Sequence, residues 1–363
     1  MRLVWADVSA IEVDEDDVQR LVVVLDDPPG EPGVALCYPA LTGRCVLGER
    51  VLCNTTAVDL ALGTGGSHVV VARAGTGSPR GVAVDAATGG HIMKLRYTPL
   101  QCDVRSVEEQ DAPGHATMAT AKVLDGMPVV CCGLHSQVPL VAAAVKRDVP
   151  AARIAYVMTD EAALPIALSE SVRASRAAGL LDTTLTCGQA FGGESEAVTL
   201  HSALLAARHV SGADVAIVAI GPGVVGTATP LGHGGVAQGE AINAASCLGG
   251  RSVAVLRVSF ADARERHRVL SHHTIVALTV VALASADVAV PSLAPARASL
   301  LEKALDDARV WDRHRRADAL SGEGDLPDMR GVQPRTMGRG PADDPAFFAA
   351  ACAAGEVAAS LLA

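Results

Sequence analysis

Histidines and carboxylates that could move protons follow short apolar runs in the second half of the chain. The segment Ser271-His272-His273 lies where a helix is expected to begin, with Ser271 as a candidate N-cap. The positive end of a helix keeps a nearby histidine neutral, so His272 could accept a proton near neutral pH. We therefore predict His272 as a catalytic acid or base, with Asp160 as its partner. His135, which follows an earlier apolar run, is a third candidate catalytic residue.

Two glycine-rich loops could hold an anion, because glycine lets backbone N–H groups approach a phosphate or carboxylate closely. One loop begins at Gly221, and the other precedes a helix predicted to start at Ser195. Basic and polar residues after the next strand would add contacts to the same anion. The predicted ligand-binding residues are Gly192, Gly193, Glu194, Gly221, Gly223, Arg264, Arg268, Ser271 and His273. The alternative is that the glycines only turn the chain, Ser271 only caps a helix and the histidines only pack.

The run from Gly221 to Gly226 also fits the Gly-x-Gly-x-x-Gly pattern of dinucleotide-binding proteins. That fingerprint requires a helix that opens on the glycines and an acidic residue about 20 positions further along. Here the segment from Thr227 to Gly234 delays the helix, and Glu240 falls inside it. The pattern therefore favours a simple anion site, and the sequence assigns no cofactor.

The cysteines and histidines show no spacing typical of a metal site. The nine cysteines include no Cys-x-x-Cys pair, and three of them recur among apparent strands, where small buried thiols are common. Adjacent residues on a helix point about 100° apart, so His272 and His273 are not expected to bind the same ion. We predict no metal site, and reduced thiols of this kind suit a cytoplasmic protein.

Alternating strands and helices must position these residues from Met127 onward. Strands are predicted at 129–134, 153–158, 183–187, 214–220, 252–258 and 288–290. Helices are predicted at 138–146, 166–178, 195–210, 235–248, 272–283 and 345–361. This alternation is typical of a Rossmann-like, mostly parallel sheet, in which loops at the carboxyl ends of the strands meet at one edge. Every candidate residue follows such a strand, so we expect His272, Asp160 and the Gly221–Gly223 turn to line one crevice.

The first 110 residues show short strands and turns, so we predict a small β-rich, barrel-like domain. Apolar runs on either side of an acidic turn at Asp14–Asp17 predict a hairpin. A strand from Ile92 is expected to continue to Val107 around Pro99. Polar residues 111–126 are predicted to link this domain to an α/β domain at 127–363. The result is an α/β protein of two domains.

Composition excludes several classes of protein. Thirty basic and forty acidic residues give a formal net charge of −10, and only 2% of residues are aromatic. A nucleic-acid-binding protein needs a basic surface and usually stacking aromatic side chains, so we expect no nucleic-acid partner. The apolar stretch from Thr274 to Ala286 is shorter than the roughly 20 residues that span a bilayer, so we expect no membrane partner.

Several strings resemble the bacterial family called domain of unknown function 3866 (DUF3866). The matching strings are Tyr156-Val-Met-Thr-Asp160, Gly188-Gln-Ala-Phe-Gly-Gly193, Gly221-Pro-Gly223, Arg264-Glu-Arg-His267 with Ser271-His-His273, Met337-Gly-Arg-Gly340, Asn54-Thr-Thr56 with Gly63-Thr-Gly-Gly66, and Lys94-Leu-Arg-Tyr-Thr-Pro-Leu-Gln101. The resemblance covers most of the chain but implies no activity, because the family has no assigned reaction. Residues 311–330 depart from it, since they are charged where an apolar strand is expected.

Three hypotheses of function follow from these residues. The first is an enzyme that acts on a small anionic metabolite at the carboxyl edge of the sheet. The second is a non-catalytic binding or regulatory protein that uses the same crevice. The third is a structural module of a homo-oligomer, in which Asn54–Thr56 and Gly63–Gly66 contact another subunit or domain. We expect a homo-oligomer, with a dimer as its simplest form.

Overall fold

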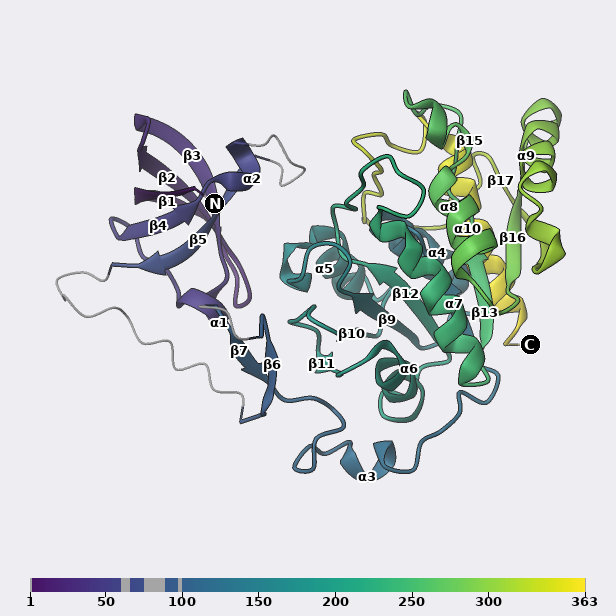
Figure 1. The fold of residues 1–363 in the computed structure, drawn as a ribbon, viewed down its shortest axis with the longest axis horizontal. Helices are drawn as coiled ribbons and strands as arrows, with labels where there is room; N and C mark the ends of the chain where they lie inside the picture. The colour runs from purple at the N-terminus through teal and green to yellow at the C-terminus, as the bar shows by residue number, and fades with distance from the viewer. Residues whose placement is uncertain (1, 60–65, 75–88, 97–99, 363) are drawn as a thin grey trace. The chain divides into compact units, whose positions relative to one another are not determined.

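The chain forms two compact units, residues 1–104 and 105–363, in a computed structural model that describes residues 2–59, 66–74, 89–96 and 100–362 (Figure 1). The first unit is built mainly of strands, and the second alternates strands and helices. The segment 111–126, predicted as a linker, belongs to the second unit.

The first unit contains a closed five-stranded barrel with the strand order β1-β2-β3-β5-β4. Its strands are β1 (Leu3–Asp14), β2 (Gln19–Asp26), β3 (Pro29–Cys37), β4 (Arg50–Asn54) and β5 (Ser67–Arg73). Neighbouring strands are antiparallel except β3 and β5, which are parallel. Alternate residues of β2 point inward, as the period of two along a strand requires: Leu21, Val23 and Leu25 are buried. The predicted hairpin and barrel are both confirmed.

Small side chains fill the barrel. Cys37, Cys45 and Cys53 lie in its core among valines, leucines and alanines, which is the packing role expected of buried thiols. Two short helices, α1 (Pro39–Thr42) and α2 (Thr56–Asp59), connect the strands.

The strand predicted from Ile92 through Val107 is wrong. The chain instead makes a two-stranded antiparallel ribbon from β6 (Ile92–Lys94) and β7 (Cys102–Val104). The apolar residues on the two sides of Pro99 therefore pair with each other and do not form one strand. Of the glycines at 63–66, only Gly66 lies within the described residues.

The second unit contains an eight-stranded sheet in the order β11-β10-β9-β12-β8-β13-β16-β17, and all neighbouring strands are parallel. The strands are β8 (Pro128–Cys131), β9 (Ile154–Thr159), β10 (Thr183–Thr186), β11 (Ser195–Glu196), β12 (Val215–Ile220), β13 (Arg251–Val255), β16 (Asp287–Ser292) and β17 (Arg315–Gly322). Every residue of β9 and β12 is buried, which is typical of central strands covered on both faces. The Rossmann-like parallel sheet is confirmed.

Helices cover both faces of this sheet (Figure 1). Core residues of α4 (Val138–Asp148), α5 (Glu170–Ala177) and α10 (Pro345–Ser360) pack on one face. Core residues of α6 (Leu200–His209), α7 (Ala237–Cys247) and α9 (Pro295–Asp307) pack mainly on the other. The other elements include α3 (His115–Met118), α8 (His272–Val276), which continues into the π-helical turn η5 (Ala277–Val281), and the short ribbon β14 (Val258–Ser259) with β15 (Val269–Leu270). Short 3-10 helices are η1 (His135–Gln137), η2 (Ile166–Leu168), η3 (Gly234–Val236), η4 (Glu265–His267) and η6 (Val310–Asp312). Many of the helix residues that face the sheet are alanines, and small side chains of this kind let a helix pack close to the sheet.

A predicted helix of the second unit needs correction at its start, and a stretch for which no element was predicted forms a strand. The helix predicted at 195–210 begins only at Leu200, because Ser195 and Glu196 form the edge strand β11 and Thr199 is the N-cap. The charged stretch after Trp311 forms the opposite edge strand, β17, with Arg315, Arg316 and Asp318 on it. Charged side chains suit an edge strand, because they discourage pairing with another chain.

Within the described ranges, none of the helices combines the length and the apolar character needed to cross a bilayer.

Candidate functional site

A cavity of about 360 Å³ lies beyond the carboxyl ends of β12, β8 and β13, which are neighbours in the sheet. Its wall comes from the loop after each of these strands and from a segment that precedes α10. The chain runs from β8 to β9, β10 and β11 on one side, then returns to β12 beside β8 before it continues to β13. The loops after β8 and β12 therefore lead to helices on opposite faces, α4 and α7, and leave a crevice between them. The lining residues include Leu134, His135, Ser136, Ser171, Gly221, Gly223, Val225, Arg257, Arg264, Arg266, His267, His273, Arg335, Thr336 and Met337.

Four arginines line the cavity, and among its described lining residues there is no carboxylate. Arg257 is 5% exposed, and burial followed by the charge of Arg264 lowers the pKa of its guanidinium to about 10. Arg266 and Arg335 lie on more exposed parts of the wall, and neither makes an ion pair with a described carboxylate. The cavity is therefore a positively charged pocket in a protein that is acidic as a whole.

Asp262 holds the arginines in place from behind the wall. One of its oxygens lies 2.9 Å from Arg264, 3.5 Å from Arg339 and 3.7 Å from Arg257. Burial alone raises the pKa of Asp262, but hydrogen bonds from Arg264 outweigh burial and lower this pKa below its ordinary value. Asp344 supports Arg339 at 3.3 Å. Three guanidinium groups thus share two carboxylates, and the cluster keeps an excess of positive charge.

The glycine turn after β12 forms another part of the wall. A Cβ at Gly221 would lie 2.2 Å from the carbonyl oxygen of Ala163, so only glycine fits there. Gly223 has a φ of +81°, which glycine adopts without strain, and its N–H is bonded to no other described residue. The predicted anion-binding turn therefore lies at the cavity.

His135 enters the cavity wall as part of a buried hydrogen-bond network. Its Nδ1 lies 3.0 Å from the Tyr156 hydroxyl, and its Nε2 lies 2.6 Å from the Ser169 hydroxyl and 3.3 Å from that of Ser171. Burial lowers the pKa of His135 to about 4. The imidazole is therefore neutral at physiological pH, and it orients two hydroxyl groups, of which Ser171 lines the cavity.

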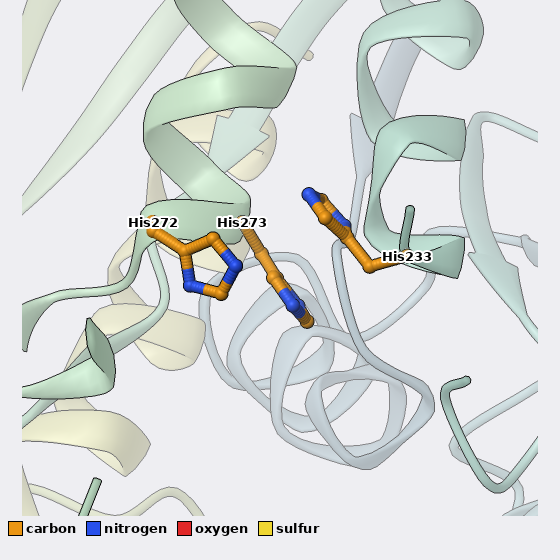
Figure 2. A group of neighbouring side chains, drawn as sticks. All are labelled: His233, His272 and His273. Atoms are coloured by element: carbon orange, nitrogen blue, oxygen red, sulfur yellow. The ribbon is translucent and has the colours of Figure 1, made fainter. Parts of the chain in front are cut away.

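Four histidines gather behind the arginines. The ring centroids of His272 and His273 lie 4.4 Å apart, and those of His233 and His273 lie 3.8 Å apart with the rings stacked. His267 lies 4.9 Å from His272 and 4.8 Å from His273. Figure 2 shows His233, His272 and His273 between the start of α8 and the loop that precedes α7. Ring nitrogens of these three residues lie within 4.8 Å of one another.

This arrangement corrects the expectation that His272 and His273 diverge. The two residues are adjacent on the first turn of α8, but their imidazole rings lie close to each other. Ser271, which caps α8 as predicted, accepts a hydrogen bond from the His273 N–H and is bonded to His267 Nδ1 at 2.7 Å. The cap therefore joins two of the four histidines, His267 and His273, through one hydroxyl.

All four imidazoles are kept neutral. Burial and the nearby charge of Arg257 lower the pKa of His267 to about 3. Burial and the other histidines lower the pKa of His273 to about 2. Burial also lowers the pKa of His233 and of His272. One nitrogen of each ring therefore keeps its lone pair at neutral pH, and the other carries the proton.

Other predicted site residues lie away from the cavity and have structural partners. Asp160 accepts a hydrogen bond from the Gln189 N–H at 2.7 Å and shows no contact with His272. The N–H groups of Gly192 and Gly193 are bonded to Glu196 and Thr186, and Glu194 pairs with Arg176. Arg268 is exposed and does not line the cavity.

The sequence prediction missed Arg257, His233 and Ser171. Arg257 could have been noticed, since it is a single charge at the end of an otherwise apolar strand. His233 lies in the same long loop as Gly221, so its type and place were a usable signal. Ser171 had no such signal, because a serine in the first turn of a helix is ordinary.

Comparison with known protein families matches residues 34–355 to one family, described as a protein of unknown function (DUF3866). A search among curated proteins and a search among solved structures each gave no match. The family match covers most of the chain and includes every segment that lines the cavity. The chain therefore belongs to the DUF3866 family.

Proposed function

We propose that the second unit binds a small organic anion, with a phosphate or carboxylate group, in the cavity at the carboxyl edge of its sheet. The observation that carries this proposal is the set of four lining arginines without a carboxylate among the described lining residues. Guanidinium groups bind phosphate and carboxylate through paired, charge-assisted hydrogen bonds. The arginines would repel a cationic ligand, and a neutral ligand would leave their positive charges without a counter-charge.

Two further features support an anion. The turn at Gly221–Gly223 brings to the wall a backbone N–H that has no partner among the described residues. Helix α4 begins beside His135 and Ser136, so the positive end of its dipole is directed toward the cavity. Backbone N–H groups, a helix end and arginines are the usual elements of phosphate sites.

The ligand also has an apolar part. Leu134, Val225 and Met337 contribute to the wall, and the last two are 61% and 62% exposed. Apolar side chains exposed at the rim of a pocket are removed from water when a ligand covers them, which favours binding. An anion with an aliphatic or aromatic group fits this lining better than inorganic phosphate does.

Binding has more support than acid–base catalysis by the residues predicted for it. An effective general base has a pKa near the working pH, and the pKa of His135 is about 4. Asp160 is hydrogen-bonded to the Gln189 backbone and is not paired with His272. In this proposal His135 positions Ser171 and Ser169, and it does not take up a proton.

Calorimetric titration with inorganic phosphate and with phenyl phosphate tests this proposal. We expect phenyl phosphate to bind more tightly, and we expect Arg266→Gln and Arg335→Gln each to weaken its binding by about 10-fold, since each removes a charged hydrogen bond. Arg268→Gln is the matched control, because this arginine lies in the same segment as Arg266 but outside the cavity. Equal affinities in wild type and both cavity variants would overturn the proposal.

A further inference from the structure

We propose that His233, His272 and His273 form a binding site for one zinc ion at the back of the anion cavity. The site goes beyond the proposed anion binding and does not depend on it. His233 comes from the long loop after β12, and the other two come from the start of α8, which follows β13 (Figure 2). Three imidazoles from two separate segments therefore meet at one point of the fold.

Burial and distance are the first support for this site. His233 is 5% exposed and His273 is 8% exposed. One ring nitrogen from each of the three lies within 4.8 Å of the other two. Nitrogens bound to one tetrahedral zinc lie about 3.4 Å apart, given Zn–N bonds of about 2.0–2.1 Å, so modest side-chain movement is enough to close the site.

Two buried nitrogens without a partner are the second support. Within the described part of the chain, neither His233 Nδ1 nor His272 Nε2 has a hydrogen-bond partner. A buried polar atom of this kind is costly unless a ligand or water satisfies it. Both atoms belong to residues of the same cluster, so one ion would satisfy both.

The opposite nitrogen of each of these two rings is already held by a backbone carbonyl. His233 Nε2 lies 3.0 Å from the Pro230 oxygen, and His272 Nδ1 lies 3.3 Å from the Arg266 oxygen. A carbonyl can only accept, so these nitrogens carry the protons and the orphan nitrogens carry lone pairs. This is the arrangement found around zinc-bound histidines, where the outer hydrogen bond sets the tautomer and the direction of the ring.

The donor set selects the kind of ion. Imidazole nitrogens suit zinc, copper and nickel, whereas magnesium and calcium require oxygen ligands. Three histidines with an open fourth position are also a frequent ligand set of catalytic zinc. Among these ions we choose zinc, because its filled d shell imposes no preferred coordination geometry.

Binding requires two local changes. The stacked rings of His233 and His273, with an angle of 8° between their planes, must tilt so that their lone pairs converge. Arg257 lies 3.3 Å from His273 Nδ1 and donates to it, so Nε2 carries the ring proton. Either Nδ1 binds the ion itself, or the proton moves from Nε2 to Nδ1 and Nε2 binds. In either case Arg257 loses this partner, and its guanidinium becomes available to an anion in the cavity.

Repulsion from the arginines is the main cost of a cation here. The cluster around Asp262 has more guanidinium groups than carboxylates, and His273 itself lines the cavity. An anion that occupies the cavity would offset this repulsion and could fill the open coordination position. This last point rests on the proposed function, whereas the zinc site itself does not.

Calorimetric titration of the metal-free full chain with zinc chloride, in a buffer without phosphate, tests the site. We expect one equivalent to bind, and we expect His233→Gln and His272→Gln each to lower the zinc affinity by at least about 100-fold. Loss of a residue that only hydrogen-bonds a zinc ligand already lowers metal affinity by about 10–100-fold. His201→Gln is the control, because His201 is an exposed histidine on α6. Zinc affinity unchanged in both cluster variants would overturn the site, and it would leave the anion proposal standing.

A second measurement does not depend on whether the variants fold. X-ray absorption at the zinc edge of the wild-type complex reports the atoms bound to the ion. We expect a shell of nitrogen and oxygen with the multiple-scattering pattern of about three imidazoles. Sulfur in the shell would assign the ion to a cysteine, such as the exposed Cys247, and would overturn the proposal.

Discussion

The chemistry of this cavity depends on single side chains that burial keeps in one protonation state. His135 is the clearest example, because its two ring nitrogens are bonded to the Tyr156, Ser169 and Ser171 hydroxyls and burial lowers its pKa from the ordinary 6.5 to about 4. A group that is neutral in the folded protein but takes up a proton on unfolding makes stability depend on pH.

The sign of this dependence can be worked out for His135. In the folded state it stays neutral down to about pH 4, whereas in the unfolded chain it is protonated below its ordinary 6.5. Stability is therefore lost as pH falls from 6.5 to 4. Between pH 7 and pH 5 this residue contributes a loss of about 2 kcal/mol.

We predict that His135→Gln loses less stability than wild type between pH 7 and pH 5, by about 2 kcal/mol. Urea unfolding at the two pH values measures this difference. The exposed His201→Gln variant is expected to follow the wild type. A His135→Gln protein with the full pH dependence would show that the histidine is charged in the folded state.

The sequence predicted which loops reach the cavity better than it predicted which side chains in those loops line it. Gly221, Arg264 and His273 were predicted as ligand contacts and do line the cavity. Asp160 and Gly192 were predicted by the same rule, but local hydrogen bonds use their polar atoms. Chain topology places a loop at the carboxyl edge of the sheet. It does not determine which polar atoms of the loop remain available to a ligand.

Elements were more predictable, because periodic burial leaves a strong pattern. The strands β9 and β12 and the helix α10 lie within about a residue of their predicted ranges. The charged edge strand β17 could not be predicted in the same way, since an edge strand buries less and carries no apolar run. Pairing partners far apart in the chain, such as β8 with β12, also depend on contacts that a local pattern does not contain.

The packing of α10 on α4 depends on one small residue. A Cβ added at Gly355 would lie 2.5 Å from the carbonyl oxygen of Val141 and 2.6 Å from the Cβ of Ala144. Both neighbours belong to a buried helix that cannot move away without disturbing the sheet beneath it. The glycine therefore sets the distance between the two helices.

We predict that Gly355→Ala lowers the free energy of unfolding by about 1–2 kcal/mol. Overpacking costs about 1–3 kcal/mol, and the higher helix propensity of alanine returns up to about 1. Gly340→Ala is the control, because the nearest atom to its new Cβ is 3.7 Å away. Thermal unfolding measures both variants, and a Gly355→Ala protein as stable as wild type would show that the helices separate freely.

At the scale of the whole molecule, all residues that line the cavity belong to the second unit. The barrel of the first unit has its own core. The predicted homo-oligomer stays a prediction. If copies of the chain associate, the charged strand β17 is a poor surface for pairing edge to edge.

Residues 105–126 decide where the second unit begins. The Val107 N–H donates to Glu196 at 2.8 Å, and the Leu124 N–H donates to Leu248 at 2.8 Å. Leu124 is also fully buried in the core between the sheet and its helices. Residues 111–126 of this segment, which were predicted as a linker, therefore contribute both hydrogen bonds and apolar burial to the second unit.

We predict that a chain beginning at Arg105 folds alone and binds phenyl phosphate as the full chain does, because it keeps every residue of the cavity wall. A chain beginning at Met127 should be less stable by about 3 kcal/mol or more, since losing one fully buried leucine side chain costs about 2–5 kcal/mol. Thermal unfolding of the two chains measures the difference. Equal unfolding temperatures would mean that residues 105–126 add no stability, that 111–126 are the linker predicted from their polar sequence, and that the second unit begins at Met127.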